Sequence, residues 1–287
     1  MPRLVVVMPA KNAESTITSA LRSTLRNLPK DSKVVVWNDG STDQTLNSVD
    51  RVSDSRVEII SSPNSVGGGA ARAALLQQTD SEFVANMDAD DYCLPWRFSL
   101  QQKHIHDLDI SFTATIKFGD RLRSLRPTSP LTYESTDVLV SLAFHNAMSH
   151  PSMYARRDAL ERAGGYRDLK VAQDYDLWLR AAAAGQRMGR LGIPCVGYRQ
   201  AGKQVSRQAG YVERIRAQGE LTEAYVGLLV AMEPGAGHML SNFTSSEAKQ
   251  DFLESFLAKQ LSKFRPGVRT YYSLLLKQKR LGPLAIV

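Results

Sequence analysis

Two acidic clusters have spacings that could serve catalysis, and the first is the segment MDADD. Its residues Asp88 and Asp90 are two positions apart and follow an apolar run. At an extended strand end, side chains two residues apart point the same way. Neighbouring carboxylates repel unless a proton or a cation offsets their charge, and hard oxygen ligands suit Mg²⁺ or Mn²⁺. We therefore predict a divalent metal at Asp88 and Asp90, with Asp91 in reserve.

The second cluster is AQDYDLW, in which Asp174 and Asp176 begin an expected helix. Acidic residues in the first turn of a helix are favourable against its dipole, so a purely structural role is open to both. The MDADD segment has a structural alternative too, as a solvated loop that caps a helix starting near Pro95. Its position directly after an apolar strand favours the metal.

The first 90 residues alternate between short apolar runs and helix-like segments. The expected strands are Leu4–Met8, Val34–Trp37, Val57–Ile60 and Phe83–Met87, and the expected helices are Glu14–Asn27, Thr42–Val52 and Gly69–Gln78. Such alternation predicts an α/β fold with a mainly parallel sheet flanked by helices. Ligands of these sheets bind at the carboxyl ends of the strands. The polar residues Asn12, Asp39, Asn64 and Asp88 fall there.

The pattern changes beyond residue 93. Strands are expected near Ile110–Phe118 and Ser152–Ala155, helices at Trp96–His106, Thr136–Phe144 and Asp174–Ala184, and a loop over 121–135. From about Gln208 onward the pattern is helical. An apolar face recurs there at helical spacing, at Phe252, Leu253, Phe256, Leu257 and Leu261. We expect this face to pack on its own domain or on a partner subunit.

Six segments together resemble a known family. VVVMPAKNAESTITSALRSTL, VVVWNDGSTDQT, NSVGGGAARAALL and FVANMDADD resemble, in order and spacing, the nucleotide-binding half of a family 2 glycosyltransferase with the GT-A fold. HPSMYARRDALERAGGYRD and VAQDYDLWLRAAAAG are similar to the acceptor half. The resemblance covers roughly residues 3–205. It implies a GT-A core over 1–207, with a nucleotide-sugar half (1–92) and an acceptor half (93–207), followed by a helical, basic extension (208–287).

The resemblance also implies roles for individual residues. Asp39 would accept a hydrogen bond from the base, most often uracil, while Asp88 would meet the ribose and Asp90 the metal. Asp174 would be the catalytic base, although Gln173 stands where the family commonly has Glu. Further contacts to the nucleotide sugar are expected from Pro9, Ala10, Asn12, Asn64, Gly67, Arg72, Ala89, His150, Arg199, Lys203 and Arg207.

These expectations describe an inverting glycosyltransferase. It would move a sugar from a nucleoside diphosphate sugar, with UDP-sugar preferred, to a hydroxyl of a glycan, lipid-linked or other saccharide acceptor. The sequence specifies neither the sugar nor the linkage. One alternative is a non-catalytic nucleotide-sugar-binding protein of the same fold, which Gln173 keeps open. A dinucleotide-dependent oxidoreductase is the other. Its G-x-G-x-x-G should follow the first strand, where this chain has MPAKNAES.

Composition bounds the partners and the compartment. The 287 residues carry a net charge of +7, but no motif for nucleic acid accompanies it, so we expect none to bind. Two cysteines, Cys93 and Cys195, cannot form a disulfide framework, which favours the cytoplasm. From Lys259 to Arg280 there are seven basic residues and no acidic one. The C-terminal helices therefore suit a homodimer contact or peripheral binding to the inner face of the cell membrane.

Overall fold

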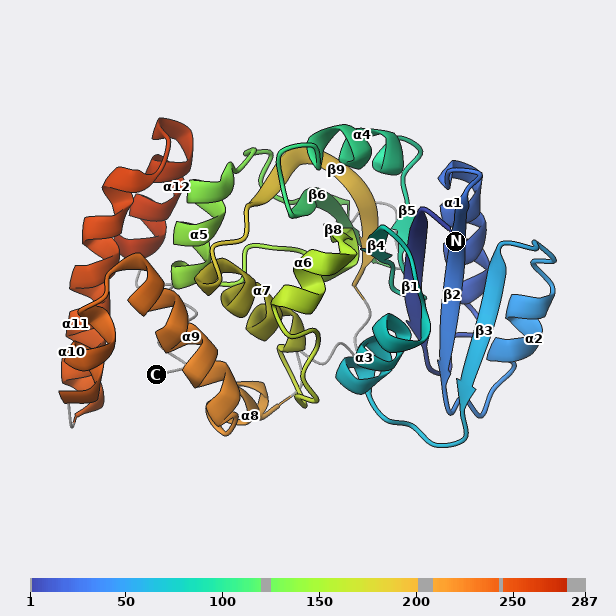
Figure 1. Ribbon diagram of the computed structural model, residues 1–287, viewed down its shortest axis with the longest axis horizontal. Coiled ribbons are helices and arrows are strands. Elements are labelled where there is room, and N and C mark those ends of the chain that lie inside the picture. The colour runs from blue at the N-terminus through green and yellow to red at the C-terminus, as the bar shows by residue number, and fades with distance from the viewer. Residues whose placement is uncertain (1, 120–124, 201–208, 243–244, 278–287) are drawn as a thin grey trace.

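The computed structural model describes residues 2–119, 125–200, 209–242 and 245–277, and its centre is one curled sheet (Figure 1). The strand order is β3 (Val57–Ser62), β2 (Ser32–Asp39), β1 (Leu4–Ala10), β4 (Phe83–Asn86), β8 (Tyr154–Arg156), β6 (Ile110–Phe118), β9 (Met188–Arg199) and β5 (Tyr92–Cys93), with β7 (Arg126–Pro127) beside β6. Strands β3, β2, β1 and β4 are parallel, as are β6 and β9. Strand β8 is antiparallel to β4 and to β6. The predicted mixed, mainly parallel α/β sheet is confirmed.

The first half of the sheet forms as its residue pattern predicts. Strand β1 is buried on both faces: Val5 and Val7 belong to one hydrophobic cluster, and Leu4, Val6 and Met8 to the other. Helices cover both faces of this parallel sheet, as such strands require. They are α1 (Ile17–Asn27), α2 (Thr45–Asp50) and α3 (Gly68–Gln78). The arrows of β2 and β3 point to the lower edge in Figure 1, along which the chain runs from β3 to α3.

The described residues of 93–200 add four helices and a short turn. These are α4 (Arg97–His104), α5 (Ser135–Phe144), α6 (Arg157–Arg162), α7 (Gln173–Ala183) and a 3₁₀ turn at His150–Ser152. The strand expected at Ser152–Ala155 begins two residues later, at Tyr154, because the turn takes up Pro151 and Ser152. The loop expected over 121–135 contains the short β7, which pairs with Ile116 and Lys117 of β6.

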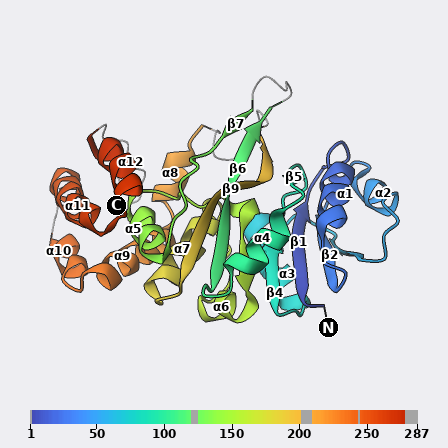
Figure 2. The same ribbon diagram turned by 90° about the horizontal axis from the view of Figure 1, so that it is seen from above.

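The C-terminal extension consists of helices, as predicted. They are α8 (Tyr211–Arg216), α9 (Gly219–Met232), α10 (Ala236–Asn242), α11 (Ser246–Gln260), a 3₁₀ turn at Leu261–Lys263 and α12 (Pro266–Lys277). Helices α10 to α12 form one end of the molecule, and β1 to β3 lie towards the other (Figure 2). The boundary expected at 207/208 falls at the edge of 201–208, outside the described residues, and stays a prediction.

The apolar face of α11 packs on the chain's own core. Leu253, Phe256 and Leu257 are buried in the same cluster as residues of α5 and α7, and Phe252 and Leu261 pack against it. Arg265 anchors the extension to α5. Its Nε donates to Asp137 Oδ2 at 2.7 Å, and its Nη1 donates to Glu134. One of the seven basic residues of this region thus pairs with the core. Of the two expected partners for the apolar face, the structure shows the chain's own domain.

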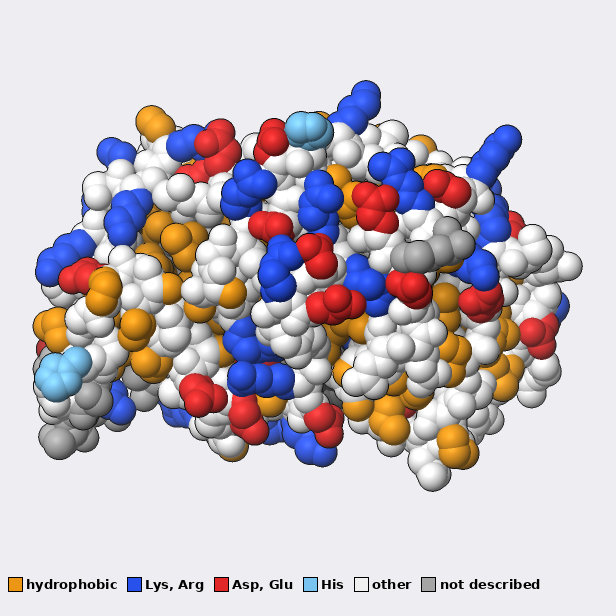
Figure 3. Space-filling model, in the orientation of Figure 1, with side chains coloured by type: hydrophobic (Ala, Val, Ile, Leu, Met, Phe, Trp, Pro, Cys, Tyr) orange, Lys and Arg blue, Asp and Glu red, His pale blue; other side chains and the backbone are white. Residues whose placement is uncertain are grey.

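The visible surface differs between the centre of the molecule and the C-terminal helices. Figure 3 shows Lys, Arg, Asp and Glu side chains interspersed over the centre and hydrophobic side chains more frequent over the C-terminal helices. Val230 and Met239 are exposed on α9 and α10. Among the described helices, none is long and apolar enough to cross a membrane.

Candidate active site

A cavity of about 780 Å³ lies where α3, α7, β9 and the segment after β4 meet. Sequence-predicted residues that line it are Arg72, Asp88, Asp90, His150, Asp174 and Arg199. Five separate parts of the chain supply them: α3, the segment after β4, the 3₁₀ turn, α7 and the end of β9. Both acidic clusters therefore reach the same cavity, although 84 positions separate Asp90 from Asp174 (174 − 90 = 84).

The three carboxylates of the MDADD segment occupy different environments. Asp88 and Asp90 line the cavity, whereas Asp91 is buried and its Oδ1 accepts the backbone N–H of Arg199 at 2.8 Å. Burial, followed by repulsion from Asp88, raises the pKa of Asp90 to about 6. Burial also raises the pKa of Asp91 well above its ordinary value. Asp91 thereby joins this loop to β9. Of the three carboxylates in this segment, those of Asp88 and Asp90 face the cavity.

Arg199 closes the loop from the other side. Its Nε donates to the backbone oxygen of Asp90 at 2.9 Å, and its guanidinium lies 4.7 Å from the centre of the Phe118 ring. This residue is the last of β9. Arg199 therefore brings a positive charge beside the loop that carries Asp90. Lys203 and Arg207, expected to act with it, lie outside the described residues.

Arg72 is the cation nearest to Asp88. Its Nη2 lies 2.5 Å from Asp88 Oδ1, and its Nη1 donates to the oxygen of Gly68 one turn earlier on α3. The arginine is buried, and its Nε has no hydrogen-bond partner among the described residues. A buried arginine with an unsatisfied nitrogen is costly. The guanidinium is therefore suited to an additional anionic or polar ligand.

The glycine run before Arg72 permits close packing. A Cβ on Gly69 would lie 3.0 Å from the backbone oxygen of Arg167, and one on Gly68 would lie 3.2 Å from Gln173 Nε2. Gly67 has a φ of +88°, in the region that favours glycine. These glycines bring the start of α3 against the segment that precedes Asp174. The run thus joins the two halves of the cavity.

Asp174 is the second residue of α7 and faces the cavity. Asn146 donates from Nδ2 to its Oδ2 at 2.9 Å. Burial raises the pKa of Asp174, while hydrogen bonds to the Tyr175 backbone and to Asn146, and the charge of Arg72, oppose the rise. The preceding Ala172 has a φ of +55°, which is strained for a residue with a side chain. Such strain persists where the surroundings fix the backbone.

Asp176, two residues further on, has the structural role that the sequence left open to both acids. Its carboxylate is fully buried and lies 2.6 Å from Arg180 Nη2, one turn later, and 3.5 Å from Arg167 Nη1. Arg180 also donates to the backbone oxygen of Gly165. This network fixes α7 to the segment after α6. The two acids of the cluster therefore differ: one is in an ion pair and the other faces the cavity.

His150 is held neutral beside the cavity. Burial, and then the charge of Arg72, lower its pKa well below the ordinary value. Its Nε2 lies 2.8 Å from the hydroxyl of Tyr166, which also accepts from Asn86 Nδ2 at 2.8 Å. Since Asn86 fills an acceptor position of this hydroxyl, the hydroxyl hydrogen is available to His150. The trio joins the end of β4 to the 3₁₀ turn.

The residues expected around the base lie at the carboxyl ends of β1 and β2. Pro9 and Ala10 are the last two residues of β1, and Ala10 is buried. Asn12 has a φ of +50°, and its Oδ1 accepts from Thr42 N at 2.9 Å. Its own N–H donates to Ser41 Oγ at 3.0 Å. Asn12 therefore ties the loop after β1 to the turn after β2.

Asp39 holds the loop that leads into α3. Its oxygens accept from Ser65 Oγ at 2.6 Å, from Val66 N at 2.7 Å and from Gly67 N at 3.1 Å. Burial raises the pKa of Asp39, but these hydrogen bonds outweigh it and the net shift is downward. Asn64, next in the same loop, is exposed. The sequence did not predict that Asp39 accepts hydrogen bonds from Ser65, Val66 and Gly67 of its own chain.

The donor set at the predicted metal position fits a hard cation. Asp88 and Asp90 supply carboxylate oxygens to one cavity, and their repulsion contributes to the raised pKa of Asp90. A divalent cation between them would relieve that repulsion, and such ions commonly take remaining ligands from phosphates. Within the described part of the chain, however, no group of three or more His, Cys, Asp or Glu side chains is arranged to hold a metal alone.

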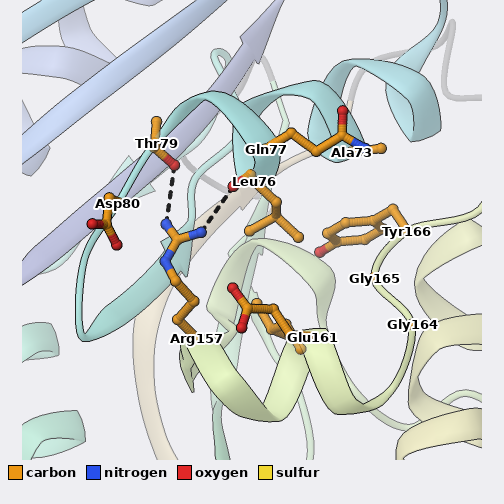
Figure 4. Close-up of a pocket in the computed structure, with 11 residues that line it drawn as sticks. Ala73, Leu76, Gln77, Thr79, Asp80, Arg157, Glu161, Gly164, Gly165 and Tyr166 are labelled. Carbon is orange, nitrogen blue, oxygen red and sulfur yellow. Dashed lines mark hydrogen bonds between the residues drawn. The ribbon is translucent and has the colours of Figure 1, made fainter.

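A second cavity, of about 490 Å³, lies between α3 and α6 (Figure 4). Arg157 crosses it and donates to Leu76 O at 2.8 Å and to Thr79 Oγ1 at 3.0 Å, which secures the end of α3. Tyr166 lines this cavity, while its hydroxyl contacts His150 of the larger one. The Tyr166 ring therefore separates the two cavities.

Several residues of the larger cavity had no signal in the sequence. They are Asn146, Tyr198, Lys117 and, from the C-terminal extension, Tyr211 and Ile215. A lone asparagine 28 positions before Asp174 has no spacing that would reveal the pairing. Ala89 was expected to contact the nucleotide and is itself buried.

The fold and this cavity define a glycosyltransferase. The family model for glycosyl transferase family 2 matches residues 5–164, more than half of the chain, and the chain belongs to that family. The amylovoran biosynthesis glycosyltransferase AmsE of Erwinia amylovora is 27% identical over 206 residues, which cover 70% of this chain and 75% of that protein. An oxidoreductase is excluded by this membership.

A second relative has a more specific name. The UDP-Glc:alpha-D-GlcNAc-diphosphoundecaprenol beta-1,3-glucosyltransferase WfgD of Escherichia coli is 30% identical over 107 residues, which cover 37% of this chain and 42% of that protein. The shared part is short, so this likeness is no evidence for the linkage that this chain forms.

Solved structures share the fold. Staphylococcus aureus TarS 1–349 in complex with UDP-GlcNAc has a TM-score of 0.62 at 21% identity, covering 93% of this chain and 82% of that one. The mannosyltransferase PcManGT of Pyrobaculum calidifontis, in complex with GDP-Man and Mn²⁺, has a TM-score of 0.56 at 18% identity, covering 99% and 82%. At these identities the likeness establishes the fold alone.

Proposed function

We propose that this glycosyltransferase transfers a sugar from a uridine diphosphate sugar to a saccharide hydroxyl with inversion of configuration. The observation that carries the proposal is the cavity in which Asp174 and the Asp88–Asp90 pair face one space. Inversion needs one carboxylate as base on the side of the sugar away from the leaving group. The two acidic groups come from α7 and from the segment after β4, which suits that division of roles.

Asp174 is the proposed base. Burial raises the pKa of this carboxyl, and a general base works best when its pKa lies near the working pH. Asn146 fixes the carboxylate through Oδ2 at 2.9 Å. The other oxygen, Oδ1, would accept the proton of the acceptor hydroxyl as that oxygen attacks the anomeric carbon. Neutral His150, on the cavity wall, would hydrogen-bond the sugar or the acceptor without adding charge.

Asp90, assisted by Asp88, would hold Mn²⁺ or Mg²⁺ with the diphosphate. When bound, such a cation neutralises charge on a departing diphosphate. Arg199 is placed to add a positive charge beside it, because its Nε is bonded to the backbone of Asp90. Arg72 would turn from Asp88 towards the incoming phosphates or ribose. The Mn²⁺ bound with GDP-Man in the PcManGT complex supports a divalent metal in this fold.

The donor nucleotide would lie at the carboxyl ends of β1 and β2. Asp39 accepts three hydrogen bonds that fix the loop leading into α3. Its carboxylate would also accept the N3–H of uracil, while Pro9, Ala10, Asn12, Asn64 and Gly67 would surround the base and ribose. UDP-GlcNAc in the TarS complex and UDP-Glc in the name of WfgD favour uridine.

The acceptor would be a glycan, with a lipid-linked glycan as the first choice because WfgD is named for one. Work on such an acceptor would bring the enzyme to the inner face of the cell membrane as a peripheral protein. The α11–α12 region, with Lys259, Lys263 and Lys277 exposed, suits an anionic surface. Homodimer formation through the same helices is the other arrangement. Both stay predictions.

A binding and hydrolysis screen tests the donor and the chemistry together. The sugar diphosphates of uridine, thymidine, guanosine and cytidine are added with and without Mn²⁺, and melting temperature and nucleoside diphosphate release are measured. A ligand of the folded state raises its stability by mass action. We expect a UDP-sugar with Mn²⁺ to raise the melting temperature most and to be hydrolysed slowly.

The controls separate binding from turnover. An Asp174→Asn variant should keep the thermal shift and lose the release of UDP. A larger shift with another nucleotide would overturn the choice of uridine. Binding of UDP-sugars by the wild type with neither hydrolysis nor transfer would favour a non-catalytic binding protein.

A further inference from the structure

One wall of the active-site cavity comes from outside the GT-A core. Tyr211 and Ile215 of α8 line the cavity, together with Asn146 and Asp174. The two residues are four apart on a helix, so they lie on one face. In Figure 1, α8 lies at the lower edge of the molecule, towards which the arrows of β2 and β3 point. An aromatic ring and an aliphatic side chain thus stand beside the proposed base.

The helix that follows α8 is firmly joined to the segment before Asp174. Buried Gln218 accepts from Val171 N at 3.2 Å and donates to Val171 O at 2.9 Å. Val171 precedes Ala172, whose φ is positive, so this pair of hydrogen bonds fixes a strained turn. Tyr225 of α9 donates to the oxygen of Ala143 at 2.8 Å. The extension is therefore packed as a fixed wall and not merely attached to the core.

The chemistry of this wall suits a carbohydrate. A pyranose ring has an apolar face of C–H groups and a rim of hydroxyls. Binding surfaces use aromatic side chains as rigid, amphipathic anchors, while a carboxylate and an amide accept and donate to hydroxyls. Burial raises the pKa of Tyr211, and the charge of Asp174 adds to the rise. The phenol therefore stays protonated at neutral pH and can donate a hydrogen bond.

We propose that Tyr211, with Ile215, forms the acceptor-sugar subsite of this enzyme. The acceptor pyranose lies with its apolar face on the Tyr211 ring and presents a hydroxyl to Asp174, whose position depends on the turn held by Gln218. The proposal rests on the proposed function, because it assigns the acceptor side of the same site. It makes the helical extension a determinant of acceptor choice.

The test compares Tyr211→Ala and Tyr211→Phe with the wild type and with Tyr271→Ala. Tyr271 is an exposed tyrosine of α12 and serves as the matched control for loss of a surface ring. The probes are octyl glycosides of glucose, galactose, mannose and N-acetylglucosamine, added to the enzyme with UDP-glucose or UDP-GlcNAc and Mn²⁺. Release of UDP is measured, because a bound glycoside either accepts the sugar and speeds release or displaces water and slows it.

We expect at least one glycoside to change UDP release by the wild type in a saturable way. Tyr211→Ala should raise the half-saturating glycoside concentration about tenfold, the size expected for truncating an aromatic anchor. Tyr211→Phe should retain most of the affinity, and Tyr271→Ala all of it. The KM for the donor should stay within about twofold in every variant, and Tyr271→Ala should also keep the wild-type rate of donor hydrolysis.

Other outcomes separate the failure of this inference from failure of the proposed function. If the wild type hydrolyses the donor and Tyr211→Ala keeps the wild-type half-saturation, the subsite is wrong and the function stands. If no glycoside of the panel alters UDP release, the subsite is likewise overturned. A parallel rise in donor KM would move Tyr211 to the donor side. A wild type that neither binds nor hydrolyses either donor would instead contradict the proposed function.

Discussion

The carboxylates at the ends of β2 and β4 belong to one sheet but are prepared for different tasks. At the end of β2, Asp39 receives three hydrogen bonds from the chain, and its pKa is lowered. After β4, Asp90 is buried near another carboxylate, and its pKa is raised to about 6. Asp174, across the cavity, also has a raised pKa. The charge of Asp39 is already stabilised by hydrogen bonds from the protein, whereas the charge of Asp90 would be stabilised by a bound ligand.

This difference indicates where the chain is assembled in advance and where it depends on its substrates. Asp39 and Asn12 keep the loops after β1 and β2 in place, so a base would meet a formed surface. The charged form of Asp90 is unfavourable to folding, because it is buried and repelled by Asp88. Proteins retain such groups where chemistry needs them.

The largest effect is expected from Asp174→Asn. The substitution keeps the size and the contact to Asn146 but removes the proton acceptor. General-base catalysis contributes about 10²- to 10⁴-fold, so kcat for transfer should fall by that range while donor affinity is unchanged. Steady-state transfer and donor calorimetry measure the two parts. Near-normal turnover would remove Asp174 from the role of base.

Asp176→Asn supplies the contrast within the same helix turn. This change leaves Arg180 without its buried partner, and breaking a buried ion pair costs about 3–5 kcal/mol. We expect a marked fall in melting temperature, with kcat for the folded fraction at low temperature reduced much less than by Asp174→Asn. Denaturant unfolding and active-site titration separate the two. Equal losses of kcat in both variants would erase the distinction between these acids.

Asp90 should show opposite effects on stability and on binding. Its pKa in the folded state, about 6, lies above the ordinary 3.8. The folded state therefore favours the proton, and the stability associated with it is lost as pH rises from about 4 to 6. Without metal at pH 7.5, the free energy of unfolding of Asp90→Asn should exceed that of the wild type by about 2 kcal/mol. At pH 4 the two should be equally stable.

The same substitution should abolish the effect of Mn²⁺ on donor affinity. In the wild type, that effect should weaken as pH falls through about 6, because the protonated carboxyl is a poor ligand. Calorimetry with and without Mn²⁺ at pH 5.5 and 7.5 measures it. An Asp90→Asn variant that still gains donor affinity from Mn²⁺ would place the metal elsewhere.

The smallest effect on donor binding is expected at Asp39. In Asp39→Asn an amide group would face the N–H of Gly67 or the groups of Ser65 and Val66, so at least one hydrogen bond is lost. Such a loss costs about 1–3 kcal/mol, and donor KM should rise with it because the loop shifts. Unfolding and donor calorimetry are the measurements. If Asp39→Asn raised the free energy of unfolding, Asp39 would resemble Asp90. That result would contradict the difference between the carboxylates at the ends of β2 and β4.

Local patterns were enough to predict most of the first half of the fold. The continuous apolar runs of β1, β2 and β4 are set by neighbours in the sequence, and so are the positions of Asp39 and Asp88 at strand ends. Element limits moved by a few residues. Helix α1 begins at Ile17 instead of Glu14 because residues 12–16 form a loop that is hydrogen-bonded to the segment after β2.

Pairings across the chain were beyond local patterns. Gln218 and Val171 are 47 positions apart, and Tyr166 and Asn86 are 80. Their contacts depend on how α7, α9 and the sheet pack, which no spacing in the sequence expresses. The part of Tyr211 in the cavity belongs to the same class. Of the predicted carboxylates, Asp88, Asp90 and Asp174 line the cavity and Asp91 does not, and packing decides what surrounds them.

The most direct test of the account is a crystal structure with a UDP-sugar and Mn²⁺, with the anomalous signal of manganese used to place the ion. We predict a single manganese peak within coordination distance of Asp90 and the diphosphate, with Asp174 on the opposite side of the sugar's anomeric carbon. A manganese peak away from Asp88 and Asp90, or an Asp174 carboxylate turned out of the cavity, would contradict it.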